Sequence, residues 1–140
     1  MKVGFTLLSI VFYFIFSPNF LTEEYVSQQP KTLQTSIADG KEIYLEFCMT
    51  CHLANGKGSE TVPPLAGSDW LQTKRKESIH AVKFGQSGLI KVNGKNYNNT
   101  MPPMGLTDEE VADVMNYVMH SWGNKQKKQV TLAEVSTIKK

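Results

Sequence analysis

The sequence predicts a small all-α domain of three to five helices. Three stretches carry apolar residues at helical spacing, and no stretch shows the alternation of a β-strand with comparable strength. The 140 residues leave room for one domain with appendages, and no internal repeat is visible. The net charge of +2 indicates no particular partner, and no basic block with interleaved aromatic residues points to nucleic acid.

The chain begins with a segment that is typical of export. Lys2 is followed by an almost wholly apolar run over residues 3–16. This run matches the hydrophobic region of a signal peptide and is shorter than a membrane span of about 20 residues. No small-x-small cleavage site follows it, so residues 1–21 are predicted to be a signal peptide or, alternatively, an N-terminal membrane anchor. The polar residues 22–36 lack periodicity and are predicted to form a linker.

The folded domain is predicted over residues 37–124. Its first helix covers residues 39–47, where apolar side chains lie four apart, and it runs directly into Cys48. A second helical region lies within residues 69–84, as one helix or two, and Gly85 is expected to end it. A domain of this size is small for a self-sufficient core, so a large buried cofactor would help to stabilise it.

The last predicted helix has the clearest pattern. Thr107-Asp108-Glu109-Glu110 matches a capping box, in which the threonine and Glu110 each satisfy a backbone donor at the helix start. The apolar residues that follow at helical spacing are Val111, Val114, Met115, Val118, Met119 and Trp122. They form one apolar face, and Gly123 is predicted to end the helix.

The C-terminal residues 125–140 contain five lysines. They are predicted to form a basic flexible tail, because lysine-rich polar stretches are usually solvated and disordered. The alternative is a basic docking strip for an acidic partner or an anionic lipid.

Both cysteines of the chain lie in Cys48-Met49-Thr50-Cys51-His52. The C-x-x-C-H pattern is typical of covalent haem attachment. Two thiols on one short turn can add to the two vinyl groups of the porphyrin, and the adjacent His52 is then placed beneath the iron as its proximal ligand. The motif therefore predicts one haem c held by Cys48, Cys51 and His52.

Two other kinds of site share the C-x-x-C pattern. A zinc site would usually need a second pair of ligands, whereas His80 and His120 lie far apart in the sequence and are most simply surface histidines. A thiol–disulfide couple of the thioredoxin type would need a surrounding βαβ pattern, which the sequence lacks. No distant cysteine remains for a disulfide framework.

A loop with two methionines precedes the last helix. In Met101-Pro102-Pro103-Met104-Gly105 the two prolines argue against regular backbone pairing. A thioether from such a loop can fill the sixth position of the iron, and His/Met ligation is the expected pair for an electron carrier. Met101 is the preferred ligand because the proline after it stiffens its approach, and Met104 is the alternative.

Taken in order, these motifs resemble those of class I c-type cytochromes, in particular small bacterial monohaem cytochromes and the cytochrome domains of periplasmic dehydrogenases or nitrite reductases. The resemblance covers most of residues 37–123. It rests on Gly40 to Tyr44, Cys48 to His52, Pro63 to Gly67, Met101 to Leu106 and Asn116 to Asn124. It implies the cytochrome c fold, with the helices arranged around one covalently bound haem c.

The resemblance also implies roles for single residues near the haem. The carbonyl of Pro63 would accept a hydrogen bond from the haem histidine and orient its ring. Leu65 would pack on the haem, although a core leucine needs no such explanation. Trp70 and Tyr97 are candidates for hydrogen bonds to the haem propionates, and plain packing is the alternative for each.

Further positions concern the packing of the helices. Gly40 and Tyr44 fall where the first helix of the family crosses the last, with Tyr117 as the opposing aromatic residue. A simple helix-start role is the alternative for Gly40. The glycine-rich residues 83–97 match no family pattern and are expected to form a loop beside the haem.

The predicted function is single-electron transfer rather than catalysis, because two axial ligands leave no open iron position for a substrate. The expected partners are periplasmic redox proteins, such as a reductase, a dehydrogenase or an oxidase, with no nucleic acid. A haem enzyme or gas sensor with a vacant sixth position and a haem-free thiol oxidoreductase are the alternatives. The expected location is the periplasm, or the inner membrane if residues 3–21 stay as an anchor.

Overall fold

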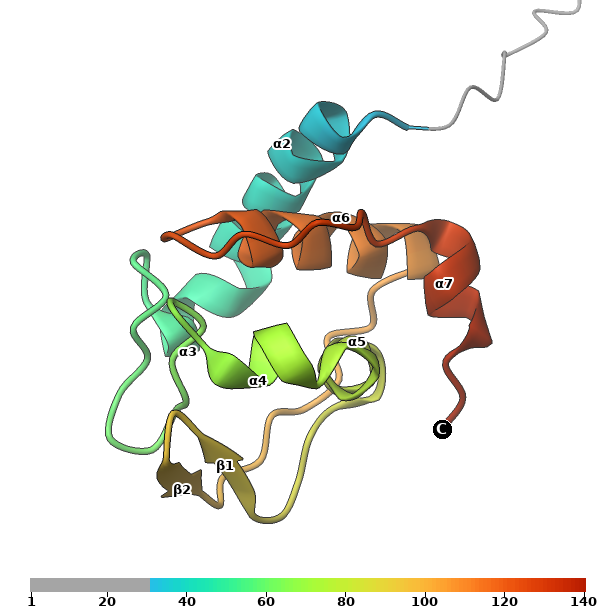
Figure 1. Cartoon of the computed structure of the whole chain (residues 1–140). Coiled ribbons are helices and arrows are strands. Elements are labelled where there is room, and N and C mark those ends of the chain that lie inside the picture. The colour runs from blue at the N-terminus through green and yellow to red at the C-terminus, as the bar shows by residue number, and fades with distance from the viewer. Residues whose placement is uncertain (1–30) are drawn as a thin grey trace, which may run out of the picture. The chain divides into compact units, whose positions relative to one another are not determined.

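The computed structural model describes residues 31–140, so the predicted signal peptide or anchor and most of the predicted linker lie outside the described residues. The helical segments are α2 (Leu33–Ile43), the π-helical turn η1 (Tyr44–Cys48), α3 (Met49–His52), α4 (Asp69–Thr73), α5 (Arg75–Phe84), α6 (Asp108–His120) and α7 (Leu132–Thr137) (Figure 1). Two short strands, β1 (Ile90–Val92) and β2 (Lys95–Tyr97), form a hairpin. The helix-rich architecture confirms the predicted fold class. No helix of this described part is both long and apolar enough to cross a membrane.

Helices α2 and α6 cross in close contact (Figure 1). Gly40 lies at the crossing, where a Cβ atom would be only 2.0 Å from the carbonyl oxygen of Asp113. Because α2 begins at Leu33, Gly40 is an interior residue, and the alternative helix-start role is wrong. The rings of Tyr44 and Tyr117 pack beside the crossing with centroids 5.3 Å apart, as the resemblance implies.

Helix α6 supplies most of the buried core. Its predicted capping box is confirmed, with Thr107 and Glu110 bonded reciprocally to each other's backbone. The buried apolar residues of the core are Tyr44, Leu71, Ile79, Val111, Ala112, Val114, Met115, Val118, Met119, Val130 and Val135. The helix ends at His120, before the predicted stop, because the chain turns to an extended conformation at Ser121. This turn brings the Trp122 ring to 5.0 Å from that of Tyr44.

The region between the haem motif and the last helix agrees with the prediction in its helical part and departs from it in the loop that follows. The helical part is divided at Lys74 into α4 and α5, the second of the two alternatives, and Gly85 ends α5 as expected. The predicted loop over residues 83–97 contains the β1–β2 hairpin. Asn93 and Gly94 form its turn with φ values of 50° and 80°, as a two-residue turn with both central residues in the left-handed region requires.

The prediction of a basic flexible tail over residues 125–140 is wrong. The chain doubles back along α6 and forms α7 (Figure 1), with Val130 and Val135 fully buried in the core. The guanidinium of Arg75 holds this segment by donating to both carboxylate oxygens of Glu134, at 2.7 and 2.8 Å. The lysines of this stretch suggest a solvated tail. Two buried valines and one ion pair instead hold it as an ordered C-terminal segment.

The N-terminal boundary of the domain also lies earlier than residue 37. Ser36 is buried and donates to the carboxylate of Asp113 at 2.6 Å. It also accepts a hydrogen bond from Asn116, whose side chain makes two further bonds to the backbone of Val130 at 2.7 and 2.8 Å. This buried polar network joins α2, α6 and the C-terminal segment, so the end of the predicted linker belongs to the folded domain.

Candidate functional site

The two cysteines lie on the turn where η1 passes into α3. Both are free thiols, Cys48 half-buried and Cys51 exposed. Burial, with a smaller contribution from Cys51, raises the pKa of Cys48 to about 11. Reactive redox cysteines have lowered pKa values. The environment of Cys48 therefore disfavours the alternative of a thiol–disulfide couple and is compatible with permanent attachment of a cofactor.

His52 follows directly and is buried, with 8% of its surface exposed. Its Nδ1 lies 3.1 Å from the carbonyl oxygen of Pro63. A carbonyl can only accept a hydrogen bond, so Nδ1–H donates and the Nε2 lone pair of a neutral ring stays free for a metal. Burial lowers the pKa of His52, against the opposing effect of the Pro63 bond, and so favours the neutral ring. The bond that the resemblance implies for Pro63 is present.

Two adjoining cavities open beside this turn. The inner one has a volume of about 590 Å³, which includes space open to solvent, and is walled mainly by apolar side chains, among them those of α4, α5 and α6. The outer one has a volume of about 1160 Å³, which includes space open to solvent, and extends toward the hairpin and the methionine loop. The residues that line both are Cys48, His52, Trp70, Ala81 and Met101. The two cavities therefore meet at the predicted haem ligands.

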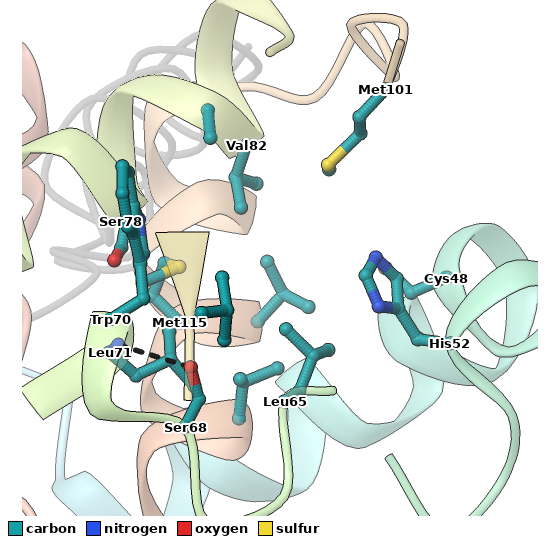
Figure 2. A pocket seen from close by; sticks show the side chains of 14 residues that line it. Cys48, His52, Leu65, Ser68, Trp70, Leu71, Ser78, Val82, Met101 and Met115 are labelled. Atoms are coloured by element: carbon teal, nitrogen blue, oxygen red, sulfur yellow. Dashed lines mark hydrogen bonds between the residues drawn. The ribbon is translucent and has the colours of Figure 1, made fainter. Parts of the chain in front are cut away.

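The structure brings the predicted site residues together from distant parts of the chain. In Figure 2 the His52 ring and the Met101 thioether point into the open space between them. Leu65 and Trp70 also line the inner cavity. The predicted residues that line the outer cavity without reaching the inner one are Cys51, Pro63, Tyr97 and the alternative ligand Met104.

The other two histidines lie away from these cavities. His120 is half-buried rather than a simple surface residue, and its ring nitrogens lie 2.8 Å from the carbonyl oxygen of Asn116 and 3.0 Å from that of Gln126. His80 is likewise half-buried and packs against Phe84 of α5, with ring centroids 5.2 Å apart. Within residues 31–140 no three His, Cys, Asp or Glu side chains are grouped to hold a metal ion, which argues against a zinc site there.

Sequence reasoning did not assign several residues of the cavity wall. Ala81 and Val82 of α5 and Val92 of β1 all line the inner cavity. So do Met115 and Val118, which belong to the apolar face of α6 and were expected only as core. A face that covers a cofactor and a face that covers a core have the same apolar periodicity, so the pattern alone cannot separate them.

These residues fit a haem. The cavity is apolar on its inner walls, as a porphyrin requires, and two free thiols lie at its outer side. A neutral imidazole and a thioether, which are the nitrogen and sulfur ligands typical of electron-transfer haem iron, point into the same space (Figure 2).

Comparison with known proteins gives a consistent result. Residues 37–122 match the cytochrome c family. The chain is 37% identical over 112 residues to cytochrome c-552 of Thermus thermophilus, covering 73% of this chain and 85% of that protein. It is 34% identical over 108 residues to the gluconate 2-dehydrogenase cytochrome c subunit of Pantoea cypripedii, covering 72% of this chain and 24% of that protein.

The chain is also similar to a third kind of protein, the cbb3-type cytochrome c oxidase subunit CcoP of Rubrivivax gelatinosus. The identity is 30% over 109 residues, covering 71% of this chain and 31% of that subunit. The family match ends before the C-terminal segment, at residue 122. With the thiols, the imidazole and the cavity in place, the chain belongs to the cytochrome c family and its motif holds a covalently bound haem c.

Proposed function

We propose that this protein is a monohaem electron carrier whose haem iron is ligated by His52 and Met101. One observation carries the proposal, namely that the His52 ring and the Met101 thioether point into one cavity that Cys48 also lines (Figure 2). When bound, haem c supplies one-electron chemistry through its iron. With His52 and Met101 both bound to the iron, no iron position would be open to a substrate, which favours a carrier over an enzyme.

Each residue of the chain has a distinct task in this proposal. Cys48 and Cys51 hold the porphyrin, and the bond to Pro63 keeps the His52 ring in one orientation and increases its basicity. The thioether of Met101 is soft and neutral, so it stabilises the ferrous state relative to the ferric state. The apolar wall of α5 and α6 excludes water and limits the rearrangement that accompanies electron transfer.

Met101 is proposed as the distal ligand in preference to Met104. Met101 lines both cavities together with His52, whereas Met104 lines only the outer one. Met104 would then pack at the solvent side of the haem.

The partners are proposed to be exported redox proteins. A dehydrogenase or an oxidase is favoured, because relatives are named as cytochrome subunits of a gluconate dehydrogenase and of a cbb3-type oxidase. A periplasmic location is favoured by the apolar N-terminal run and by covalent haem attachment, with residues 3–21 as an anchor if they stay uncleaved. Cell fractionation followed by N-terminal sequencing would distinguish the free form from the anchored form.

The ligand assignment is tested on holoprotein from a host that attaches haem c. The ferric protein is expected to show the charge-transfer band of methionine-bound iron, and Met101→Ala to lose it while Met104→Ala keeps it. The reverse result would overturn the assignment. High-spin ferric spectra and ready binding of carbon monoxide by the reduced wild type would instead indicate a haem enzyme or gas sensor. A negative pyridine haemochrome assay would contradict haem attachment altogether.

A further inference from the structure

Just after α5, which ends at Phe84, the chain is hydrogen-bonded to the backbone of Met101. The N–H of Gln86 donates to the carbonyl of Met101 at 2.9 Å, and the N–H of Met101 donates back to the carbonyl of Gln86 at 2.8 Å. The two residues thus form an isolated antiparallel bridge. The loop predicted around the two prolines is present, and this single bridge lies before Pro102 and Pro103, which take no part in it.

This bridge is the backbone tether of the methionine loop. Over residues 98–106, which the structure describes in full, no other backbone–backbone hydrogen bond holds the loop. Pro102 and Pro103 cannot donate one, since they lack an N–H. The position of Met101 is therefore set by its two bonds to Gln86.

The geometry of the bridge also sets the direction of the Met101 side chain. Residues that exchange both bonds in an antiparallel pair have their side chains on the same face. Gln86 and Met101 accordingly line the same outer cavity, and the thioether of Met101 reaches further to the inner one (Figure 2). The methionine side chain has three rotatable bonds that must be ordered when its sulfur binds the iron. A backbone that is already fixed lowers the conformational entropy lost in this step.

Gly85 makes this close approach possible. It ends α5 with φ at +86°, a backbone conformation that residues other than glycine rarely adopt. A Cβ atom at this position would lie 2.8 Å from the carbonyl oxygen of Met101 and 3.0 Å from Cδ of Pro103. A side chain here would push the methionine loop away from α5.

We infer that Gly85 and Gln86 are positioning residues for the distal ligand, which they hold through the backbone of Met101. The inference rests on the proposed ligand role of Met101. Helix α5 then has two roles. Its Ala81 and Val82 line the haem cavity, and the residues that follow it position the sulfur atom of Met101. A shift of the end of α5 then changes the strength of the iron–sulfur bond.

The chain offers a matched pair of variants for the test. Gly85→Ala adds a methyl group against the loop. Gly88→Ala adds it at nearly the same φ, +84°, and no atom beyond the two neighbouring residues lies within 4 Å of the added carbon. Both variants place a side chain at a positive φ, and only Gly85→Ala brings it against Met101.

The measurement is made on the haem-loaded ferric proteins, by the charge-transfer band and by titration with imidazole, which competes for the sixth position. We expect Gly85→Ala to lose most of the band and to bind imidazole at least about tenfold more tightly, a change of about 1.4 kcal/mol. Gly88→Ala is expected to match the wild type. A band and an imidazole affinity in Gly85→Ala that equal those of Gly88→Ala would overturn the inference.

A second pair decides the matter if Gly85→Ala does not accumulate as folded holoprotein. Gln86→Pro removes the N–H that donates to Met101, and the ψ of 168° at the preceding Gly85 is compatible with a following proline. Gln86→Ala keeps both backbone bonds. We expect the proline variant alone to weaken the band and strengthen imidazole binding, and equal behaviour of the two would refute the positioning role.

The ligand role of Met101 and the positioning role of Gly85 and Gln86 can be refuted separately. If Met101→Ala keeps the band, the ligand assignment itself is wrong. If Met101→Ala loses the band while Gly85→Ala and Gln86→Pro keep it, the assignment stands and only the positioning role is overturned.

Discussion

A single methyl group at Gly40 is expected to destabilise the whole domain. In Gly40→Ala the new Cβ atom would lie 2.0 Å from the carbonyl oxygen and 2.4 Å from the carbonyl carbon of Asp113. These are backbone atoms of α6, so no side-chain rotation relieves the contact. Helices α2 and α6 must move apart instead, and the packing of Tyr44 on Tyr117 beside the crossing is disturbed with them.

Two opposing effects set the size of the change. Alanine is favoured over glycine in a helix interior by about 1 kcal/mol. Relief of the contact needs the helices to separate by about 1 Å, which forfeits a quarter to a half of the dispersion energy at each facing contact. Overpacking costs about 1–3 kcal/mol and more where the structure cannot adjust, as at a backbone contact. At this backbone contact we expect a cost of about 3–4 kcal/mol. The net loss after the gain in helix propensity is then about 2–3 kcal/mol, which lowers Tm by about 10 °C.

The assay is urea unfolding of the haem-loaded protein, followed by far-UV circular dichroism. Ala38→Gly is the control, because Ala38 is an exposed residue of the same helix and reports helix propensity alone. It should cost about 1 kcal/mol. A Gly40→Ala protein that is as stable as the wild type, or more stable, would refute the steric argument.

Two further predictions concern the C-terminal segment. Glu134→Gln should cost about 1–2 kcal/mol at pH 7, because the carboxylate accepts two bonds from Arg75. The bonds to Arg75 hold the pKa of Glu134 below its usual value, so this stability is present above the unfolded-state pKa and is lost as pH falls through the folded-state pKa. Asn116→Ala should cost about 3–4 kcal/mol, because it leaves both backbone polar groups of Val130 buried without their partner. Urea unfolding measures both, and hydrogen exchange of the Val130 amide should accelerate in the Asn116 variant.

Each of these predictions has a control at an exposed site. Glu77→Gln removes only a loose surface pair with Lys74 at 3.9 Å and should change stability by less than about 0.5 kcal/mol. Asn96→Ala lies on the exposed side of β2 and should be equally mild. A constant difference between Glu134→Gln and wild type from pH 7 down to pH 3 would contradict the ion-pair argument. An unchanged Val130 exchange rate would contradict the role given to Asn116.

The fold could be predicted where the signal is local. The capping box at Thr107 and Glu110 involves groups three residues apart, and the structure has both of its bonds. The hairpin was missed although Asn93-Gly94 is a strong local turn signal, because its strands are too short to show alternation. The C-terminal segment was assigned wrongly because its lysines outweigh two valines, and the burial of those valines depends on surfaces distant in sequence.

The sequence by itself determined the chemistry of the site. Thiols, imidazole and thioether are set by residue type, and the spacing of Cys48, Cys51 and His52 requires only one turn of chain. The tertiary structure alone decided which methionine shares the inner cavity with His52, what holds its backbone, and that the C-terminal segment completes the core. The physical reason is the sequence separation of the interacting groups. Covalent spacing and helix capping act within a few residues, whereas the bridge between Gln86 and Met101 and the burial of Val135 arise only when the chain folds.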